Sequence, residues 1–382
     1  MADPKLCGVC GGPFHRPALL TYPDSPRSAQ GFLDSPEQPD EVVSLEIFQC
    51  QCCGLVQHGL PPVPYYRDVI RAVAFSKEMG DFRAEQLGVW LKHSNLRERR
   101  LLEVGCGKGE YMDLLQRAGA RHVYGVENAP LSVAEAQKSG YQVAPGYMAP
   151  GFANPWPERF DGFAIFSFME HWPDLNGSLR ALQNFLNEGA VGLVEVPNFE
   201  FIVANGLYSE FTVDHIYYFD RQTLRTVLEL NGYEVIAIDA IWHGYILSAQ
   251  VRKRTPQKPA GFIAKQQRII EQLHVFARRF EFAEVVVWGA GHQALAVMSL
   301  AKLQNWVSHV VDSAPFKQNK YTPGTHLLIK SPSSLLLDRP KAVLIMAAAY
   351  SDEVAQTIER EYPQIEHVAI LREEQLEVVK GG

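Results

Sequence analysis

The chain has 382 residues, which at roughly 100–200 residues per domain corresponds to two or three domains. Hydrophobic residues make up 47% and charged residues 21%, the balance of a globular protein with full hydrophobic cores. The net charge of −7 argues against a protein that works mainly on nucleic-acid backbones, so we expect no nucleic-acid partner. The segment Met1–Leu6 lacks the apolar core of a signal peptide, and no apolar run is long enough to span a bilayer, so we expect a cytoplasmic protein without membrane association.

The first 60 residues differ in character from the rest of the chain. They hold five of the six cysteines and are rich in Pro, Gly and Asp, but they are short of helical periodicity. The stretch Tyr22–Ser28, which contains two prolines, is predicted to be a loop. A segment this small and polar has little hydrophobic core of its own, so we expect a metal ion to staple it.

The spacing of the cysteines predicts a zinc site. Cys7 and Cys10 form one CxxC knuckle, Cys50 and Cys53 form a second, and two such knuckles place four thiolates tetrahedrally around Zn²⁺. A site closed by four protein ligands is structural. Cys52 does not fit the knuckle spacing and is expected to be a bystander, although it is an alternative to Cys50 or Cys53. The competing interpretation is a pair of redox cysteines with unrelated thiols.

Residues 64–97 carry an apolar stripe with helical period, from Ala72 to Leu87, and are predicted to be helical. From Arg100 onward strands alternate with helices, which predicts a parallel sheet covered on both faces. The predicted elements are strands Leu101–Val104, His122–Glu127, Phe160–Phe168 and Val191–Val196, helices starting near Gly109 and Val133, and a helix over Leu175–Leu186. A helix over Thr223–Leu230 and an antiparallel pair, Tyr233–Ile238 and Tyr245–Val251, are expected to close the sheet.

A glycine-rich loop follows the first of these strands and opens a helix. Gly105, Gly107 and Gly109 let the backbone turn sharply and approach a ligand closely, which fits either a dinucleotide or S-adenosylmethionine. The acidic residue inside the motif, Glu103, and Glu127, placed at the end of the next strand to accept both ribose hydroxyls, favour the second.

Together with Asp161 near the start of the predicted strand Phe160–Phe168, this set resembles the class I methyltransferases, which bind S-adenosylmethionine. Cys106 within the loop is expected to be a small filler rather than a nucleophile. The cofactor-binding residues that the resemblance implies are Glu103, Gly105, Cys106, Gly107, Gly109, Glu127, Asn128 and Ser167.

Two histidines are candidates for the chemistry. His171 follows the predicted strand Phe160–Phe168, where the carboxyl ends of a parallel sheet face the ligand crevice, and the alternative is that it packs against the cofactor. His215 stands beside Asp214 and before Tyr217 and Tyr218, and a histidine with a carboxylate neighbour is suited to act as a general base. The alternative is that His215 caps the next helix and the aromatic residues pack the core.

The segment Arg252–Ala260 is charged, contains two prolines and is predicted to be a linker. Beyond it we predict helices Phe262–Phe280, Gln293–Leu303 and Val354–Glu361 and strands Val285–Trp288, His309–Val311, Ala342–Met346 and His367–Ile370. The loop Trp288–Ala294 looks like a dinucleotide loop, with Asp312 near the expected acidic position. We favour a structural turn there, or contact with a substrate's phosphates at the helix N-terminus, over NAD binding.

The order of these parts resembles the zinc-containing, S-adenosylmethionine-dependent sugar C-methyltransferases, which act on nucleotide-linked keto-deoxysugars. The matching residues are the two CxxC knuckles with Cys53–Gln57, the glycine loop, Glu170 with His171, Val194–Asn198, Asp214–Phe219, and Trp288–Gly291 with Tyr321–Thr325. The resemblance implies an α/β fold in three parts. These are a zinc-binding module over 1–62, a class I methyltransferase Rossmann-like sheet over 63–255 and a smaller Rossmann-like substrate-binding domain over 256–382.

In that family the zinc is structural and the C-terminal domain helps to form the wall of the substrate cleft. A histidine acts as the catalytic base, and the matching residue in this sequence is His215. A sugar C–H bond is acidic only beside a carbonyl group, so His215 would remove that proton while Asp214 orients its imidazole. Tyr217, Tyr218 or His171 would donate to the enolate oxygen.

The chain departs from the family where Asp214 replaces the usual Glu and where Thr212 replaces a common Tyr. The family's N-terminal tyrosine-rich stretch matches loosely around Tyr66, which with Tyr217 and Tyr218 is a predicted substrate contact. The alternatives are an O- or N-methyltransferase on a small molecule, a zinc-ribbon RNA methyltransferase, and a non-catalytic domain that binds S-adenosylmethionine as a scaffold or sensor. We expect the partner to be a small nucleotide-sugar substrate.

Overall fold

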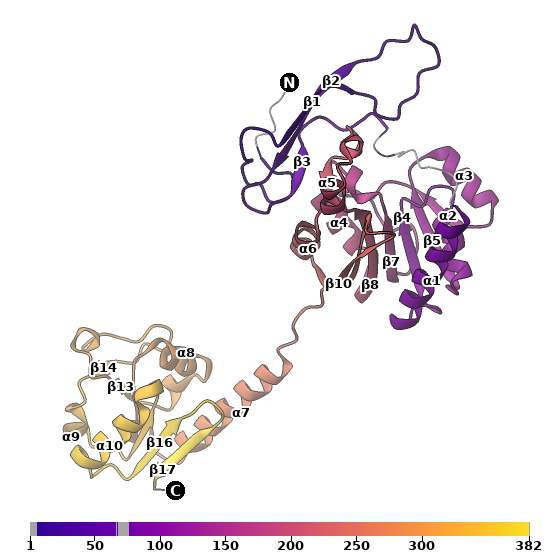
Figure 1. The fold of residues 1–382 in the computed structure, drawn as a ribbon. Coiled ribbons are helices and arrows are strands. Elements are labelled where there is room, and N and C mark those ends of the chain that lie inside the picture. The colour runs from indigo at the N-terminus through magenta and orange to yellow at the C-terminus, as the bar shows by residue number, and fades with distance from the viewer. Residues whose placement is uncertain (1–5, 66, 68–75, 382) are drawn as a thin grey trace. The chain divides into compact units, whose positions relative to one another are not determined.

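The computed structural model describes residues 6–65, 67 and 76–381. The chain divides into two compact units, Met1–Pro256 and Gln257–Gly382, each with its own sheets and hydrophobic core (Figure 1). Tyr66 lies outside the described residues, as do Ala72 and Phe75 of the predicted apolar stripe. None of the helices in the described part of the chain is long and apolar enough to cross a membrane.

The N-terminal residues form three strands of a four-stranded antiparallel sheet that was not predicted. Its strands in sheet order are β1 (Leu20–Pro26), β2 (Val42–Gln49), β3 (Val56–His58) and β9 (Tyr217–Tyr218). The predicted loop over Tyr22–Ser28 is therefore wrong for its first five residues. Leu45 and Ile47 of β2 are fully buried and pack with Tyr218 in a small core, so this module has apolar support besides its cysteines.

A seven-stranded sheet forms the centre of the first unit, which confirms the predicted α/β fold. The strands are β4 (Arg100–Val104), β5 (His122–Glu127), β6 (Gln142–Pro145), β7 (Phe160–Phe166), β8 (Leu186–Pro197), β10 (Tyr233–Ile241) and β11 (Ile246–Lys253). Their order is β10-β11-β8-β7-β4-β5-β6. Strands β4 to β8 are parallel, and β11 runs antiparallel to both of its neighbours, β8 and β10. The chain leaves β4 on one side and returns on the other, so the carboxyl end of β4 is the switch point where such sheets bind ligands.

The helices of this unit are α1 (Lys77–His93), α2 (Glu110–Arg117), α3 (Pro130–Lys138), α4 (Leu175–Gln183), α5 (Phe199–Ala204) and α6 (Arg221–Leu230). Helix α6 begins at a capping box, in which the Asp220 carboxylate accepts the Thr223 N–H while the Thr223 hydroxyl accepts the Asp220 N–H. Helix α4 ends three residues before its predicted end because Leu186 already pairs with Phe160 of β7.

The second unit has a six-stranded sheet in the order β14-β13-β12-β15-β16-β17. Its elements are α7 (Ala260–Ala277), β12 (Val285–Trp288), α8 (His292–Leu300), β13 (His309–Val311), β14 (Ile329–Lys330), α9 (Ser334–Asp338), β15 (Ala342–Ile345), α10 (Ser351–Glu361), β16 (His367–Leu371) and β17 (Leu376–Lys380). The first five strands are parallel and β17 is antiparallel. Both β12 and β15 are buried along their whole length, as expected for strands covered on both faces.

Candidate active site

The glycine loop after β4 packs tightly against aromatic side chains. Gly105, Gly107 and Gly109 have φ angles of 73°, 58° and 97°, which residues with a side chain rarely adopt. A Cβ on Gly105 would lie 2.4 Å from the Phe168 ring, and one on Gly109 would lie 2.6 Å from the Tyr141 ring. The loop therefore needs glycine both for its backbone angles and for its close contacts.

Glu127 ties this loop to the end of β5. Its Oε2 accepts the N–H of Gly107 at 2.9 Å, and its Oε1 accepts the N–H of Ala129 at 2.8 Å. Each carboxylate oxygen can accept a further hydrogen bond, so a ribose hydroxyl can still reach either one. The geometry fits the predicted contact with ribose, and it adds a role in holding the loop that the sequence did not indicate.

The other predicted cofactor residues lie around the same loop. Glu103 on β4 is fully buried, and Asn128 directly follows β5. Cys106 is also fully buried, and a Cβ on Gly125 would lie 2.4 Å from its sulfur, which fits a filler. Ser167 is exposed directly after β7 with a left-handed φ of 44°, an angle that non-glycine residues adopt mostly at turns and functional sites.

Asp161 lies at the amino ends of the parallel strands, opposite the end that carries the glycine loop. It is the second residue of β7, and its Oδ1 accepts a hydrogen bond from Asn187 at 2.9 Å. Because the ligand crevice of a parallel sheet is at the carboxyl ends of the strands, Asp161 does not support the cofactor site. Asp161 therefore marks the resemblance to methyltransferases without being a cofactor contact.

Glu127→Ala is expected to weaken S-adenosylmethionine binding by about 10- to 100-fold, because charge-assisted hydrogen bonds are worth roughly 1.5–3 kcal/mol. Isothermal titration calorimetry measures the change. Asp161→Ala is the matched control, because it removes a carboxylate from the amino ends of the strands in the same sheet. It should leave the affinity for S-adenosylmethionine unchanged. Equal affinities for Glu127→Ala and the wild type would contradict the placement of ribose at Glu127.

The two candidate histidines lie against each other although 44 positions separate them in the sequence. His171 is on the 3₁₀ turn η1 (Met169–His171), and its ring centroid is 4.7 Å from that of His215 at an interplanar angle of 79°. The N–H of Ile216 donates to the carbonyl of Glu170 at 2.9 Å, which holds the two segments together. Side-chain N and O atoms of Glu170, His171 and His215 all lie within 4.8 Å of one another.

Asp214, which was predicted to orient the His215 imidazole, is not hydrogen-bonded to that ring in the described structure. Its Oδ1 accepts the hydroxyl of Thr212 at 2.7 Å, and its backbone oxygen accepts the Nδ1–H of His171 at 2.8 Å. Among the described residues its carboxylate has no hydrogen bond to His215, so it acts on that ring through charge. Burial lowers the pKa of His215 below its ordinary value, and the carboxylates of Asp214 and Glu210 act in the opposite direction.

The two tyrosines predicted to bind substrate are core residues. Tyr217 and Tyr218 are neighbours on β9, and each is only 3% exposed. The hydroxyl of Tyr217 is 3.4 Å from the carbonyl of Pro173, and that of Tyr218 donates to the carbonyl of Thr212 at 3.2 Å. Burial raises the pKa of both phenols. The structure therefore contradicts their substrate-binding role, since both hydroxyls face protein backbone.

His58 on β3, which sequence reasoning missed, anchors the His215 segment. Its Nε2–H donates to the carbonyl of Val213 at 3.1 Å, its Nδ1 accepts the N–H of Leu60 at 3.1 Å, and its backbone N–H donates to the carbonyl of Ile216 at 3.2 Å. Burial lowers its pKa to about 4, so the ring is neutral, as these bonds require. A lone histidine on a short strand carries no pattern that could have revealed this.

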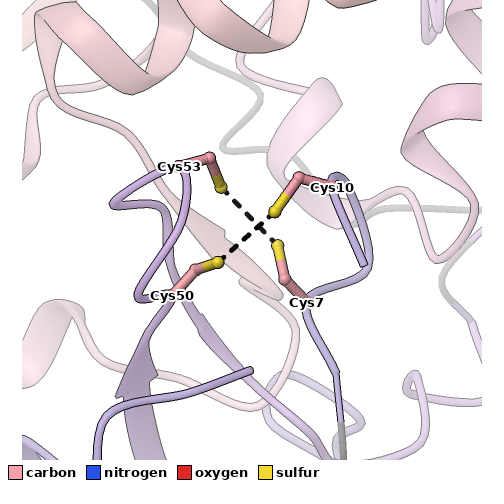
Figure 2. A group of neighbouring side chains, drawn as sticks. All are labelled: Cys7, Cys10, Cys50 and Cys53. Atoms are coloured by element: carbon pink, nitrogen blue, oxygen red, sulfur yellow. Dashed lines mark hydrogen bonds between the residues drawn. The ribbon is translucent and has the colours of Figure 1, made fainter. Parts of the chain in front are cut away.

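Four thiols converge between two loops of the N-terminal module (Figure 2). The sulfurs of Cys7 and Cys53 are 3.8 Å apart, those of Cys10 and Cys50 are 3.4 Å apart, and all four lie within 4.8 Å of one another. Zn–S bonds of about 2.3 Å in a tetrahedral site separate the sulfurs by about 3.8 Å. The spacing fits such an ion, and the exposed Cys52 is not one of the four.

The two loops that carry these thiols have the same backbone design. In each, the carbonyl of the first cysteine accepts the N–H of a glycine four residues later, Gly11 or Gly54. These glycines have φ angles of 72° and 78°, which allow the tight turn. A backbone N–H also points at sulfur, as from Gly12 to Cys10 at 3.3 Å. Such donors stabilise thiolates and not neutral thiols.

Comparisons with known proteins agree with this architecture. A methyltransferase domain model matches residues 74–238, and a C-methyltransferase C-terminal domain model matches residues 253–365. The C-methyltransferase NovU from Streptomyces niveus is 23% identical over 394 residues, which cover 91% of this chain and 90% of that protein.

Other matches cover less of the chain. The ubiquinone biosynthesis O-methyltransferase of Pseudomonas syringae pv. tomato is 31% identical over 106 residues, 26% of this chain and 45% of that protein. The structure of S-adenosylmethionine-bound CalS10, an amino pentose methyltransferase from Micromonospora echinaspora, has a TM-score of 0.37 and 15% identity over 48% of this chain and 100% of its own.

The similarity to NovU spans nearly the whole chain, and the two domain models follow each other in the same order as the two units of the structure. The methyltransferase model covers the glycine loop and the histidine pair, and the second model describes the C-terminal domain of C-methyltransferases. The chain is therefore an S-adenosylmethionine-dependent methyltransferase, and over nearly its whole length it is similar to a C-methyltransferase.

Proposed function

We propose that this enzyme methylates a carbon of a nucleotide-linked keto-sugar through a base-generated enolate. The observation that carries the proposal is the contact between the rings of His215 and His171. His171 lies three residues after Phe168, whose ring packs against Gly105 of the cofactor loop. The similarity to a C-methyltransferase supports transfer to carbon. The nucleotide-sugar class rests on the sequence resemblance, chiefly over Asp214–Phe219.

Methylation at carbon requires a base. A C–H bond beside a carbonyl group can lose its proton because the carbonyl oxygen takes up the electron pair. His215 accepts this proton on its imidazole, the C–H bond breaks, and the electron pair forms the enolate. S-adenosylmethionine supplies the methyl group as an electrophile. The protein must then hold the nucleophilic carbon in line with that methyl group.

His171 is the remaining candidate donor to the enolate oxygen, since Tyr217 and Tyr218 are committed to the core. Its Nδ1–H is held by the carbonyl of Asp214, so donation to substrate would use Nε2–H. Donation from both ring nitrogens requires the doubly protonated imidazole. The Glu170 carboxylate lies 4.0 Å from Nε2, where it would favour that form.

We further infer that the four thiols hold a structural zinc ion. Burial, together with the neighbouring thiols, raises the pKa of Cys7 to about 11, so four thiolates do not coexist here without a cation. A divalent cation reverses this because it binds the deprotonated form. Cys7, Cys10, Cys50 and Cys53 would be its ligands, and they leave no coordination position for a substrate.

Methyl transfer is expected to be lost at acidic pH. The pKa of His215 lies below its ordinary 6.5, so the ring is unprotonated and ready to accept a proton at neutral pH. As the pH falls through this pKa the ring becomes protonated and kcat/KM should decline, with a plateau above it. The check is kcat/KM for an accepted keto-sugar from roughly pH 5 to 9. A rate that rises on acidification would contradict His215 as the base.

A further inference from the structure

Helix α1 carries the most deeply buried ion pair among the described residues. Arg83 of α1 is 1% exposed, Glu195 of β8 is fully buried, and Nη1 of Arg83 donates to Oε2 of Glu195. The other carboxylate oxygen, Oε1, accepts the amide of Gln86 and, at 2.9 Å, the hydroxyl of Ser248 on β11. Oε1 of Gln86 in turn accepts Nη1 of Arg83 at 2.8 Å. The proposed reaction uses neither of the two buried charges.

Stability alone does not explain a pair of this kind. Taking two charges out of water costs about as much free energy as their attraction returns, so apolar side chains of similar volume often give an equally stable protein. Apolar side chains do not supply direction, however. A carboxylate that is bound by donors from both α1 and β11 fixes the place at which α1 docks on the sheet. The pair is therefore suited to position the segments that it joins.

The guanidinium of Arg83 also lies against two stacked aromatic rings. Its central carbon is 5.4 Å from the ring centroid of Tyr111 and 5.9 Å from that of Phe166, and the two centroids are 4.2 Å apart. Tyr111 is in the first turn of α2, two residues after Gly109 of the glycine loop. Phe166 is the last residue of β7 and directly precedes Ser167. Because β4 and β7 are neighbours, Arg83 contacts the segments that follow both strands.

Glu195 holds the turn at Ser167 through its backbone. Its carbonyl accepts the N–H of Ser167 at 2.9 Å. Ser167 has a left-handed φ of 44°, and a non-glycine residue keeps such an angle only where the surrounding structure imposes it. Both members of the ion pair therefore act on this turn. Glu195 acts through the hydrogen bond of its carbonyl, and Arg83 acts through the ring of Phe166.

We propose that Arg83 and Glu195 are positioning residues for S-adenosylmethionine. Their ion pair sets the place of the glycine loop relative to the turn at Ser167, and the cofactor binds between these two segments. Neither charged group contacts the cofactor, since both act through Tyr111, Phe166 and the Ser167 backbone. The proposal rests on the predicted cofactor contacts at the glycine loop and Ser167, and it does not depend on the identity of the acceptor.

The test is the double variant Arg83→Met with Glu195→Gln in the full-length protein. It removes both buried charges at nearly constant volume, and the amide oxygen can still accept from Gln86 and Ser248. Its Tm should therefore stay close to that of wild type, whereas Arg83→Met alone leaves an unpaired charge in the core and should lower Tm. The affinity of the double variant for S-adenosylhomocysteine, measured by calorimetry, should fall at least ~10-fold.

Hydrogen exchange separates a positioning role from a general loss of structure. In the ligand-free double variant, the amides of residues 105–111 and 166–168 should exchange faster than in wild type. The amides of the central strands β4 and β5 should keep their protection. Lys77→Met with Asp81→Asn is the matched control, because it removes an exposed ion pair from the same helix. It should leave both the affinity and the exchange rates unchanged.

The proposal is overturned if the double variant binds S-adenosylhomocysteine as tightly as wild type. It is also overturned if Tm and the protection of the whole sheet fall together with the affinity, because the pair would then be purely structural. Neither measurement needs an acceptor. A failure to methylate any keto-sugar would therefore contradict the proposed function alone, and an unchanged affinity in the double variant would contradict the positioning role alone.

Discussion

Replacement of His215 by Asn is expected to reduce methyl transfer by about 10²–10⁴-fold, the usual contribution of a positioned general base. S-adenosylmethionine affinity and Tm should change little. The reason is structural, since among the described residues the His215 side chain has a ring contact with His171 but no hydrogen bond that holds the fold. Initial rates, calorimetry and thermal unfolding of the same preparation separate the three quantities.

Asp214→Asn should reduce the rate of methyl transfer less than His215→Asn does. The amide oxygen can still accept the Thr212 hydroxyl, so the loop should be kept while the negative charge near His215 is lost, and the rate should fall less. With a keto-sugar and S-adenosylhomocysteine bound in heavy water, exchange of the proton beside the carbonyl should need His215. Full activity in His215→Asn would leave His171 as the remaining candidate and favour O- or N-methylation.

Loss of the zinc site should have the second-largest effect, on stability first. Structural zinc contributes on the order of 10 kcal/mol to the folding of small zinc modules. Cys7→Ser or Cys50→Ser should therefore unfold the N-terminal module and lower Tm sharply. Cys52→Ser is the matched control, an exposed thiol beside the same loop, and it should keep both the metal and Tm.

Loss of zinc should also disturb the active site, because the N-terminal sheet connects the zinc loops to the His215 segment. The knuckle N–H of Gly8 donates to Oε1 of Gln57, and Gln57 pairs with Tyr217, two residues from His215. Zinc-depleted protein should thus lose methyl transfer while the central sheet still binds S-adenosylmethionine.

Metal analysis should find about one zinc per chain, the content of a single four-thiolate site. No zinc in freshly purified protein would contradict the assignment. A second equivalent that disappears in His171→Ala would mean that the cluster of Glu170, His171 and His215 binds metal rather than acting as a base.

The sequence predicts this fold best where a strand is apolar and ends at a glycine loop. Strand β5 falls on its predicted residues, and β4 begins one residue early, because both read as short buried strands between turn signals. The fourth strand of the N-terminal sheet, Tyr217–Tyr218, was missed because it pairs with β3, a segment about 160 residues away. Local periodicity carries no information about such a partner.

Residues of the site divide in the same way. The four cysteines and the glycine loop could be identified because the spacing of these residues is typical of a zinc site and of a nucleotide-binding loop. Tyr217 and Tyr218 could not be assigned from sequence, because neighbouring strand residues face opposite sides and tertiary packing alone decides whether each side is core. The Asp214 bond to Thr212 was likewise hidden, since Thr212 and His215 lie within two residues of Asp214 and the sequence does not show which of them its carboxylate faces.

The position of the transferred methyl group tests the central claim most directly. The enzyme is incubated with S-adenosylmethionine carrying a ¹³C methyl group and a panel of nucleotide-linked keto-sugars that are ¹³C-labelled in the ring, and the products are examined by NMR. Our account predicts a product in which the labelled methyl carbon couples directly to a ring carbon beside the keto group. A methyl group on oxygen or nitrogen, or no transfer to any keto-sugar alongside transfer to another class of acceptor, would contradict it.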